Sequence, residues 1–103
     1  MRYQVLIGME VNDLIADWSL FCRSFGMELG CPGKDSHVVT VVSENRVSHI
    51  PIAHPAGSDP EATLQMFLND FIRRHPHAEL QALDSEEALH EACSDEDHVG
   101  FMI

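Results

Sequence analysis

The chain has 103 residues, 45% of them hydrophobic, and its six Lys and Arg against seventeen Asp and Glu give a formal net charge of −11 at pH 7. This length and composition exclude a disordered chain and predict one domain over residues 1–103 with its own hydrophobic core. The negative charge repels phosphate groups, and no apolar run approaches the roughly 20 residues that cross a bilayer, so we expect neither direct nucleic-acid binding nor a membrane interaction.

The chain begins with a predicted strand and a predicted helix. Residues 3–11 (YQVLIGMEV) are rich in strand formers, whereas residues 12–25 repeat apolar side chains at the three- and four-residue spacing of an amphipathic helix. Asn12 or Asp13 is expected to cap this helix. Gly26 suits the left-handed residue that follows the last helical turn.

The next segment, GCPGKDSH, looks like a phosphate-binding loop. When its Gly-Lys is aligned with the P-loop pattern G-x-x-x-x-G-K-[ST], Glu28 replaces the first glycine and Asp35 replaces the hydroxyl residue. Both replacements put a negative charge where phosphate would bind. We therefore predict a turn between two apolar segments.

A short strand and a hairpin surround this turn. Residues 27–29 are the short strand, and the β-branched runs 37–43 and 47–54 are separated by a few polar residues, which predicts a hairpin. Pro51 cannot donate a ladder hydrogen bond, so the second hairpin strand is expected at an edge or to end early.

The second half continues with two further helices and two strands. Asp59 before Pro60 suits the N-cap and first position of a helix over residues 60–74, and Ser58 with Glu61 offers an alternative capping box. The remaining predicted elements are a strand over 77–83, a helix over 85–93 capped by Asp84, and a strand over 99–103.

This order of elements predicts an α+β fold, an antiparallel or mixed sheet with two to three helices on one face. The first six elements match a ferredoxin-like β-α-β-β-α-β core. The last helix and strand are then a C-terminal α-β extension of the sheet. Free sheet edges favour a homodimer formed by edge pairing.

The cysteines and histidines do not form a recognisable reactive motif. Cys22, Cys31 and Cys93 include no C-x-x-C spacing, which predicts reduced thiols and a cytoplasmic protein. Cys31 could form a nucleophile pair with His37, but no other residue supplies an orienting group, so we assign no catalytic residue.

The sequence contains seven histidines. In a strand, His49 and His54 would lie on opposite faces, so they cannot easily share a metal ion. His75 and His77 flank a proline at a helix end, where imidazoles interact favourably with the helix C-terminus. His90 and Cys93 could approach them only through the tertiary fold. We therefore expect no metal site and no cofactor.

The stretch VNDLIADWSLFCRSFGMELG (residues 11–30) combines a V-x-D-L start, an aromatic residue at Phe21 and a glycine at Gly26. It resembles the opening of the glyoxalase/bleomycin-resistance superfamily, although Cys22 stands where that family usually has an aromatic residue. The family binds metal from its first strand, where only Gln4 could be a ligand here. The resemblance therefore implies a metal-free domain that binds a small, cationic ligand over the concave sheet.

Acidic residues crowd the last twenty positions: Asp84, Glu86, Glu87, Glu91, Asp95, Glu96 and Asp97. Acid–base catalysis needs one carboxylate shielded from water, and these are expected on an exposed helix and a polar loop. We therefore predict a non-enzymatic interaction module, of inhibitor, immunity or regulatory type, that binds a basic protein surface through this region. The small-ligand-binding domain is the alternative, followed by a metal- or thiol-dependent enzyme.

Overall fold

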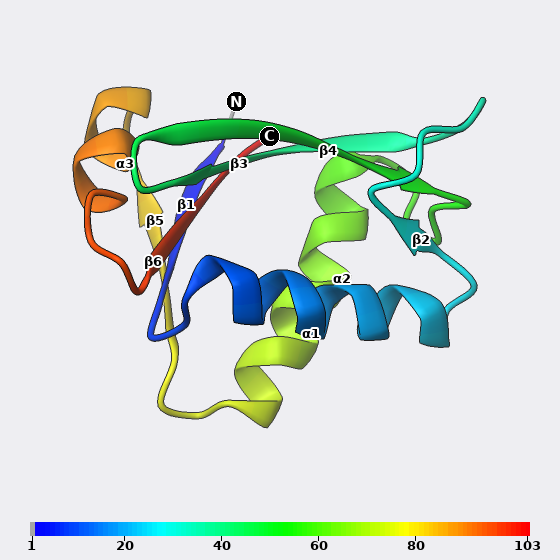
Figure 1. Ribbon diagram of the computed structural model, residues 1–103, viewed down its shortest axis with the longest axis horizontal. Coiled ribbons are helices and arrows are strands. Elements are labelled where there is room, and N and C mark those ends of the chain that lie inside the picture. The colour runs from blue at the N-terminus through cyan, green and yellow to red at the C-terminus, as the bar shows by residue number, and fades with distance from the viewer. Residues whose placement is uncertain (1) are drawn as a thin grey trace.

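The computed structural model describes residues 2–103 and shows an α+β fold with three helices and a six-stranded antiparallel sheet (Figure 1). Met1, the first residue of the expected domain, lies outside the described residues. The elements in chain order are β1 (Tyr3–Ile7), α1 (Val11–Ser24), β2 (Glu28–Leu29), β3 (His37–Ser43), β4 (Arg46–Ala53), α2 (Pro60–Arg74), β5 (Glu79–Leu83), α3 (Glu86–Ala92) and β6 (His98–Met102).

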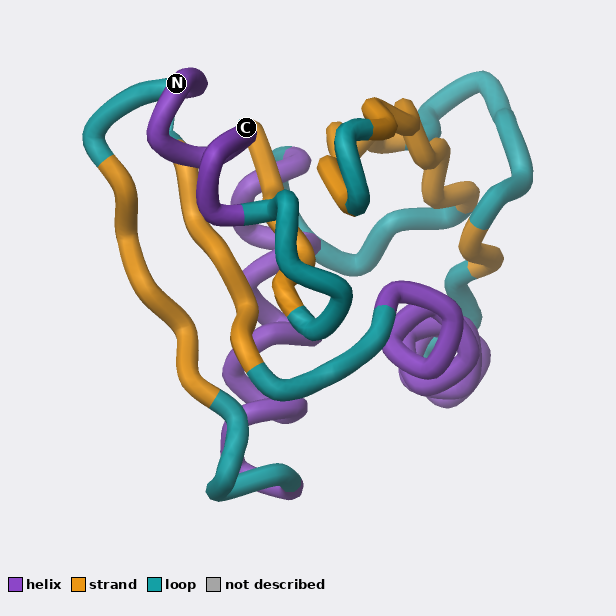
Figure 2. The backbone as a smooth tube through the Cα atoms, turned by 60° about the vertical axis from the view of Figure 1, so that its left-hand side comes forward, coloured by secondary structure: helices purple, strands orange, loops and turns teal. Residues whose placement is uncertain are grey.

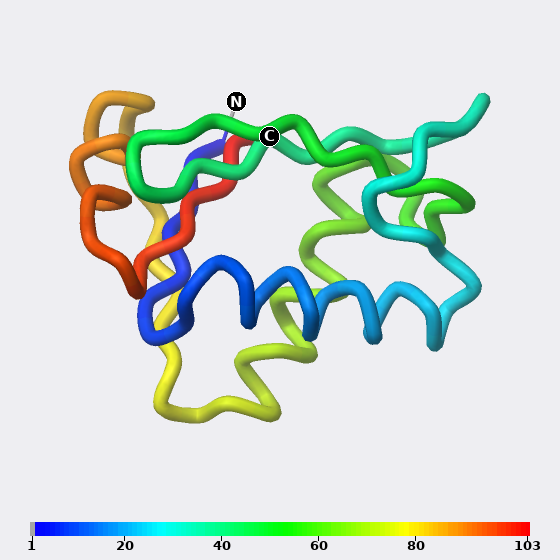
Figure 3. The backbone as a smooth tube through the Cα atoms, viewed as in Figure 1, coloured from blue at the N-terminus to red at the C-terminus, as the bar shows by residue number. Residues whose placement is uncertain are grey.

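The C-terminal strand lies in the interior of the sheet. The strand order is β2-β4-β3-β6-β1-β5, and β6 pairs with β1 on one side and β3 on the other. The expected extension at the edge of the sheet is therefore wrong, and the ferredoxin-like arrangement is not confirmed. The two chain ends meet because β1 and β6 are neighbours: Ile103 N donates to Arg2 O at 3.0 Å (Figure 3).

The helices divide between the two faces of the sheet. The larger cluster of buried residues joins Trp18 of α1 and Phe67 of α2 to Phe101 of β6. The smaller cluster lies on the other face, where Leu89 of α3 packs against Val5 of β1. α1 and α2 contribute to the first cluster, whereas α3 covers the opposite face near β1 and β6 (Figure 1), so the expected placement of two to three helices on one face is not confirmed.

The hairpin forms where it was predicted. β3 and β4 pair from His37↔Ile52 to Ser43↔Arg46, and Glu44 and Asn45 at the turn have φ of 47° and 65°. Two left-handed residues are what a tight two-residue hairpin turn requires. β4 pairs with β2 only at its last two residues, so most of its outer side is an edge, as Pro51 indicated.

Two of the predicted helix caps are wrong. α1 begins one residue earlier than expected, with Glu10 as its N-cap, because Val11 already packs against the core. α3 is capped by Ser85, whose Oγ accepts from the backbone N–H of Ala88 at 3.1 Å. The cap of α2 is confirmed: Asp59 Oδ1 accepts from the N–H of Ala62 at 2.7 Å.

Gly100 of β6 lies beneath α3, and a larger residue does not fit there. A Cβ at this position would lie 2.6 Å from Cys93 Sγ and 2.7 Å from Leu89 Cδ1. We expect Gly100→Ala to lower the free energy of unfolding by about 1–3 kcal/mol because α3 must shift to make room. Chemical denaturation measures this loss.

Gly33→Ala is the matched control for this substitution, since its Cβ would meet only Ala53 Cβ at an ordinary 3.7 Å. A Gly100→Ala protein as stable as the Gly33→Ala protein would contradict the packing of α3 on β6.

Candidate functional site

The seven acidic residues predicted from the sequence all lie on α3 and the two segments beside it, and all seven are exposed. Buried Leu89 and Cys93 hold the inner side of α3 on the sheet. The side chains of Glu86, Glu87 and Glu91 are therefore left on the solvent side of the same helix. We call the seven residues Asp84, Glu86, Glu87, Glu91, Asp95, Glu96 and Asp97 the α3 acidic surface.

Backbone contacts fix the loop that carries Asp95, Glu96 and Asp97. Asp97 O accepts from the N–H of Gly8 at 2.9 Å, and Asp95 O accepts from the N–H of His98 at 3.2 Å. The first bond attaches the loop to the β1–α1 connection, and the second joins it to the start of β6, while its carboxylates remain in solvent. The loop therefore presents its charges from a defined position.

The α3 acidic surface has little compensating positive charge. Within residues 2–103, its carboxylates come within 4.0 Å of no Lys or Arg nitrogen, and the nitrogens that do come so close belong to two histidines, which form ion pairs only when protonated. Glu86 lies 4.0 Å from His90 Nε2, and the imidazole of His98 lies 3.6 Å from Asp95 and 3.7 Å from Asp97. Because the clustered carboxylates are uncompensated, their fields add outside the protein.

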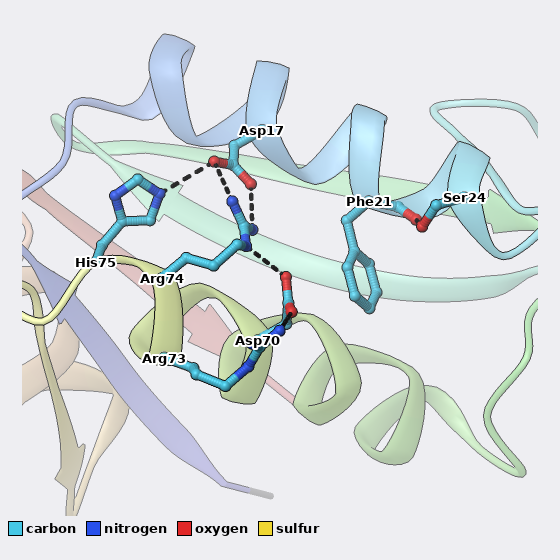
Figure 4. A network of polar contacts seen from close by, with 7 residues as sticks. All are labelled: Asp17, Phe21, Ser24, Asp70, Arg73, Arg74 and His75. Carbon is cyan, nitrogen blue, oxygen red and sulfur yellow. Dashed lines mark hydrogen bonds and ion pairs between the residues drawn. The ribbon is translucent and has the colours of Figure 1, made fainter.

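Arginines pair with acids elsewhere, most clearly where α1 meets α2. Arg74 donates to both oxygens of Asp17, at 2.6 and 3.1 Å, and its Nε donates to Asp70 at 2.6 Å (Figure 4). His75 Nε2 lies 3.2 Å from the same Asp17 carboxylate. Hydrogen bonding to Arg74 lowers the pKa of Asp17 below its usual range. The geometry is that of an ion-pair network fastening the two helices.

Asp17→Asn tests this network. We expect it to lower the free energy of unfolding by about 1 kcal/mol at pH 7, because the amide cannot replace the bidentate ion pair. Since the folded pKa of Asp17 is lowered, its stabilisation is present above the unfolded pKa of about 3.9 and is lost as pH falls through the folded value. The difference between wild type and Asp17→Asn should therefore shrink in acid unfolding experiments. A difference independent of pH would contradict the assignment.

Sequence reasoning did not find this network. Asp17 and Arg74 are 57 residues apart, and the apolar stripes that predict their two helices do not indicate which polar side chains face each other. The Arg73-Arg74-His75 run at the end of α2 was a signal for charge near the helix C-terminus, but spacing alone could not identify its acidic partner.

The GCPG segment forms the connection between β2 and β3. Gly30 has a φ of +84°, and Ser36 N–H donates to Gly33 O at 3.3 Å, which agrees with the predicted turn. The candidate pair of Cys31 and His37 is not brought together. His37 Nδ1 lies 2.9 Å from Thr63 Oγ1 of α2, and Cys31 interacts with Glu28.

The other candidate histidines lie at different places in the fold. His49 Nδ1 lies 3.0 Å from Thr40 Oγ1 across the hairpin, and His54 is exposed after β4. His75 is the C-cap of α2, and its ring lies 5.9 Å from that of His77. In the described part of the chain, no three His, Cys, Asp or Glu side chains gather in a group that could hold a metal ion.

The three free thiols differ in burial, since Cys22 and Cys93 are buried and Cys31 is exposed. Burial raises the pKa of Cys22 and Cys93 to about 11. Hydrogen bonding to Glu28 raises the pKa of exposed Cys31, which makes its reactive thiolate less abundant. We expect iodoacetamide at pH 8 to label Cys31 in the folded protein and all three thiols only after unfolding, as peptide mass spectrometry would show. Rapid labelling of Cys22 or Cys93 would contradict their burial.

Two hollows on the surface lie beside the GCPG segment. One of about 420 Å³ is lined by Ser19, Arg23, Glu28, Leu29 and Cys31. A neighbouring hollow of about 210 Å³ is lined by Glu28, Cys31, Pro32, Gly33, Lys34, Asp35, Ala53 and His54. Neither has the sheet centre as its floor, which is where the resemblance to the glyoxalase/bleomycin-resistance superfamily placed a ligand.

Comparison with known proteins adds no functional assignment, because no family model, no curated protein and no solved structure matches the chain. In residues 2–103, no helix combines the length and the apolar character that crossing a bilayer requires.

Proposed function

We propose that the protein is a small non-enzymatic interaction module that binds a basic protein surface through the α3 acidic surface. One observation carries this proposal: seven exposed carboxylates share one end of the molecule, without a Lys or Arg within ion-pair distance among the described residues. An inhibitor, an immunity protein or a regulatory subunit acts in this way, by occupying a basic site on its target.

Exposed, clustered carboxylates are well suited to binding a basic protein surface. Exposed carboxylates keep their hydration until the partner arrives, and clustered charge accelerates the encounter with a basic partner more than it increases the final affinity. A surface held by β1, β6 and the buried side of α3 is also preorganised, which lowers the entropic cost of binding. We place this interaction in the cytoplasm, where three free thiols stay reduced.

Affinity capture from cells of the source organism tests the proposal. The bait is the wild-type chain, and a second bait carries Glu87→Lys and Glu91→Lys, two exposed positions one helical turn apart on α3. A third bait carries Glu28→Lys and Asp35→Lys, which reverse the same number of charges at exposed positions around the GCPG segment. Glu28 belongs to β2 and Asp35 to the segment that connects β2 to β3, and β2 lies at the opposite end of the molecule from α3 (Figure 1).

The expected result is a basic protein retained at low salt by the wild type and by the control variant, but not by the α3 variant. The purified partner must then bind the wild type directly. Equal retention by all three baits, or no protein captured at low salt, would overturn the proposal.

A further inference from the structure

Strand β5 forms one edge of the sheet. It pairs with β1 through all five of its residues, from Glu79↔Ile7 to Leu83↔Tyr3, and no strand lies beyond it in the described chain (Figure 2). Among residues 2–103, its backbone groups make no bond to a loop or turn either. The outward N–H and C=O groups of β5 are therefore available to a further strand.

The two edges of the sheet differ in their protection. At the opposite edge, Pro51 interrupts the donors of β4, and the two-residue strand β2 covers its end. The sequence of β5, ELQAL, contains no proline and no lysine, the residues that commonly block an edge. Apart from the charge of Glu79 at its first position, β5 therefore lacks the sequence features that prevent pairing with another chain.

The β5 sequence is compatible with pairing to itself. If two β5 strands run antiparallel with Gln81 opposite Gln81, all five residues are paired, and no other register achieves this. Glu79 then lies opposite Leu83, and Leu80 lies opposite Ala82. No two like charges are directly opposed, which is the arrangement that would destabilise a strand pair.

The two ends of β5 differ in their flanking charges. Before the strand the chain carries Arg73 and Arg74, which pair with Asp70 and Asp17 of the same copy, whereas after it come the acids Asp84, Glu86 and Glu87. In Figure 1 the end of α2 and the start of α3 lie toward opposite ends of β5. Antiparallel pairing places the arginine-bearing end of each copy beside the acidic end of the other, twice by symmetry, so the two acidic ends do not meet.

We propose that two copies of this chain form a homodimer by antiparallel pairing of their β5 strands about Gln81, which joins the two six-stranded sheets into one. This inference does not rest on the proposed function, since the dimer is formed by backbone pairing at the edge of the sheet, although Asp84, Glu86 and Glu87 of the α3 acidic surface lie near that edge. Five residues a side make a small interface, so the dimer forms in a concentration-dependent way.

Sedimentation velocity over about 5 to 500 µM chain tests the dimer, since small interfaces are weak. The wild type is expected to shift from monomer to dimer over this range. Gln81→Glu replaces an exposed amide by a carboxylate of the same shape and puts two negative charges opposite each other, so the dimer should be lost. Gln81→Lys should act in the same way with the opposite charge.

Gln65→Glu is the matched control, because it makes the same chemical change on α2, which packs against β3, three positions from β5 in the strand order. It should dimerise like the wild type. Circular dichroism confirms that each variant is folded, and hydrogen exchange should show concentration-dependent protection within residues 79–83. A wild type that stays monomeric at about 500 µM, or a dimer that both Gln81 variants leave intact, overturns the proposal.

Discussion

Trp18→Ala is expected to lower the free energy of unfolding by about 3–5 kcal/mol, a large fraction of the stability of a domain of this size. The Trp18 side chain is fully buried and stacks on Phe67 of α2, with ring centroids 5.3 Å apart. It also meets the ring of Phe101 of β6 edge-on at 6.0 Å. One residue thus connects α1, α2 and the central strand, and alanine would leave a cavity where the three meet.

Leu20→Ala on the same helix is the control for this prediction, because Leu20 is 65% exposed. It should change the free energy of unfolding by less than about 0.5 kcal/mol. Urea denaturation followed by circular dichroism measures both variants, since loss of the tryptophan prevents a fluorescence comparison. Similar losses for the two variants would contradict the placement of Trp18 in the core.

The second large effect concerns binding. With the purified partner from affinity capture, Glu87→Lys/Glu91→Lys is expected to slow association by about 10- to 100-fold at low salt, because clustered charge steers the encounter. The fold should tolerate the change: both residues are exposed, and the cost of a lysine in the first turn of α3 is offset by the gain from one in its last turn. Stopped-flow measurement of the association rate checks this.

The Glu28→Lys/Asp35→Lys variant has the same net charge as the α3 variant. Comparing the two therefore separates the effect of the α3 acidic surface from that of the total charge. If it slows association as much as the α3 variant does, the total charge of the protein, and not the α3 acidic surface, controls binding. An unchanged rate in the α3 variant would remove the surface from the interaction altogether.

The helices and the hairpin could be predicted because their signals are local. The apolar stripe of α1, the Asp59-Pro60 start of α2 and the β-branched runs of β3 and β4 each determine an element from neighbouring residues. Gly26, with a φ of +74°, ends α1 as predicted, because a residue without Cβ adopts this conformation readily.

The position of β6 was missed although the sequence holds a signal for it. The run HVGFM does not alternate between apolar and polar residues, and four of its five residues are buried, as in a strand covered on both faces. An edge strand with one solvated face would alternate. The order of the elements along the chain suggested that β6 extends the sheet at its edge. Because both faces of β6 are buried, however, the strand must lie in the middle of the sheet.

Part of the candidate site could likewise be predicted from the sequence, and part could not. The acidic residues of α3 could be found because they are close in sequence, and the structure places all seven on the surface. The contact of Asp17 with Arg74 and His75 depends on how α1 crosses α2, which no spacing in the sequence encodes. The proposed pairing of β5 edges likewise depends on which strand ends the sheet.

The most direct test of the central claim is the salt dependence of the association rate between the wild-type chain and its partner. If the α3 acidic surface guides binding, the rate should fall by about tenfold or more between 0.05 and 0.5 M salt, while the dissociation rate changes far less. An association rate that is constant across this range would contradict the claim that uncompensated carboxylates on α3 recognise a basic surface.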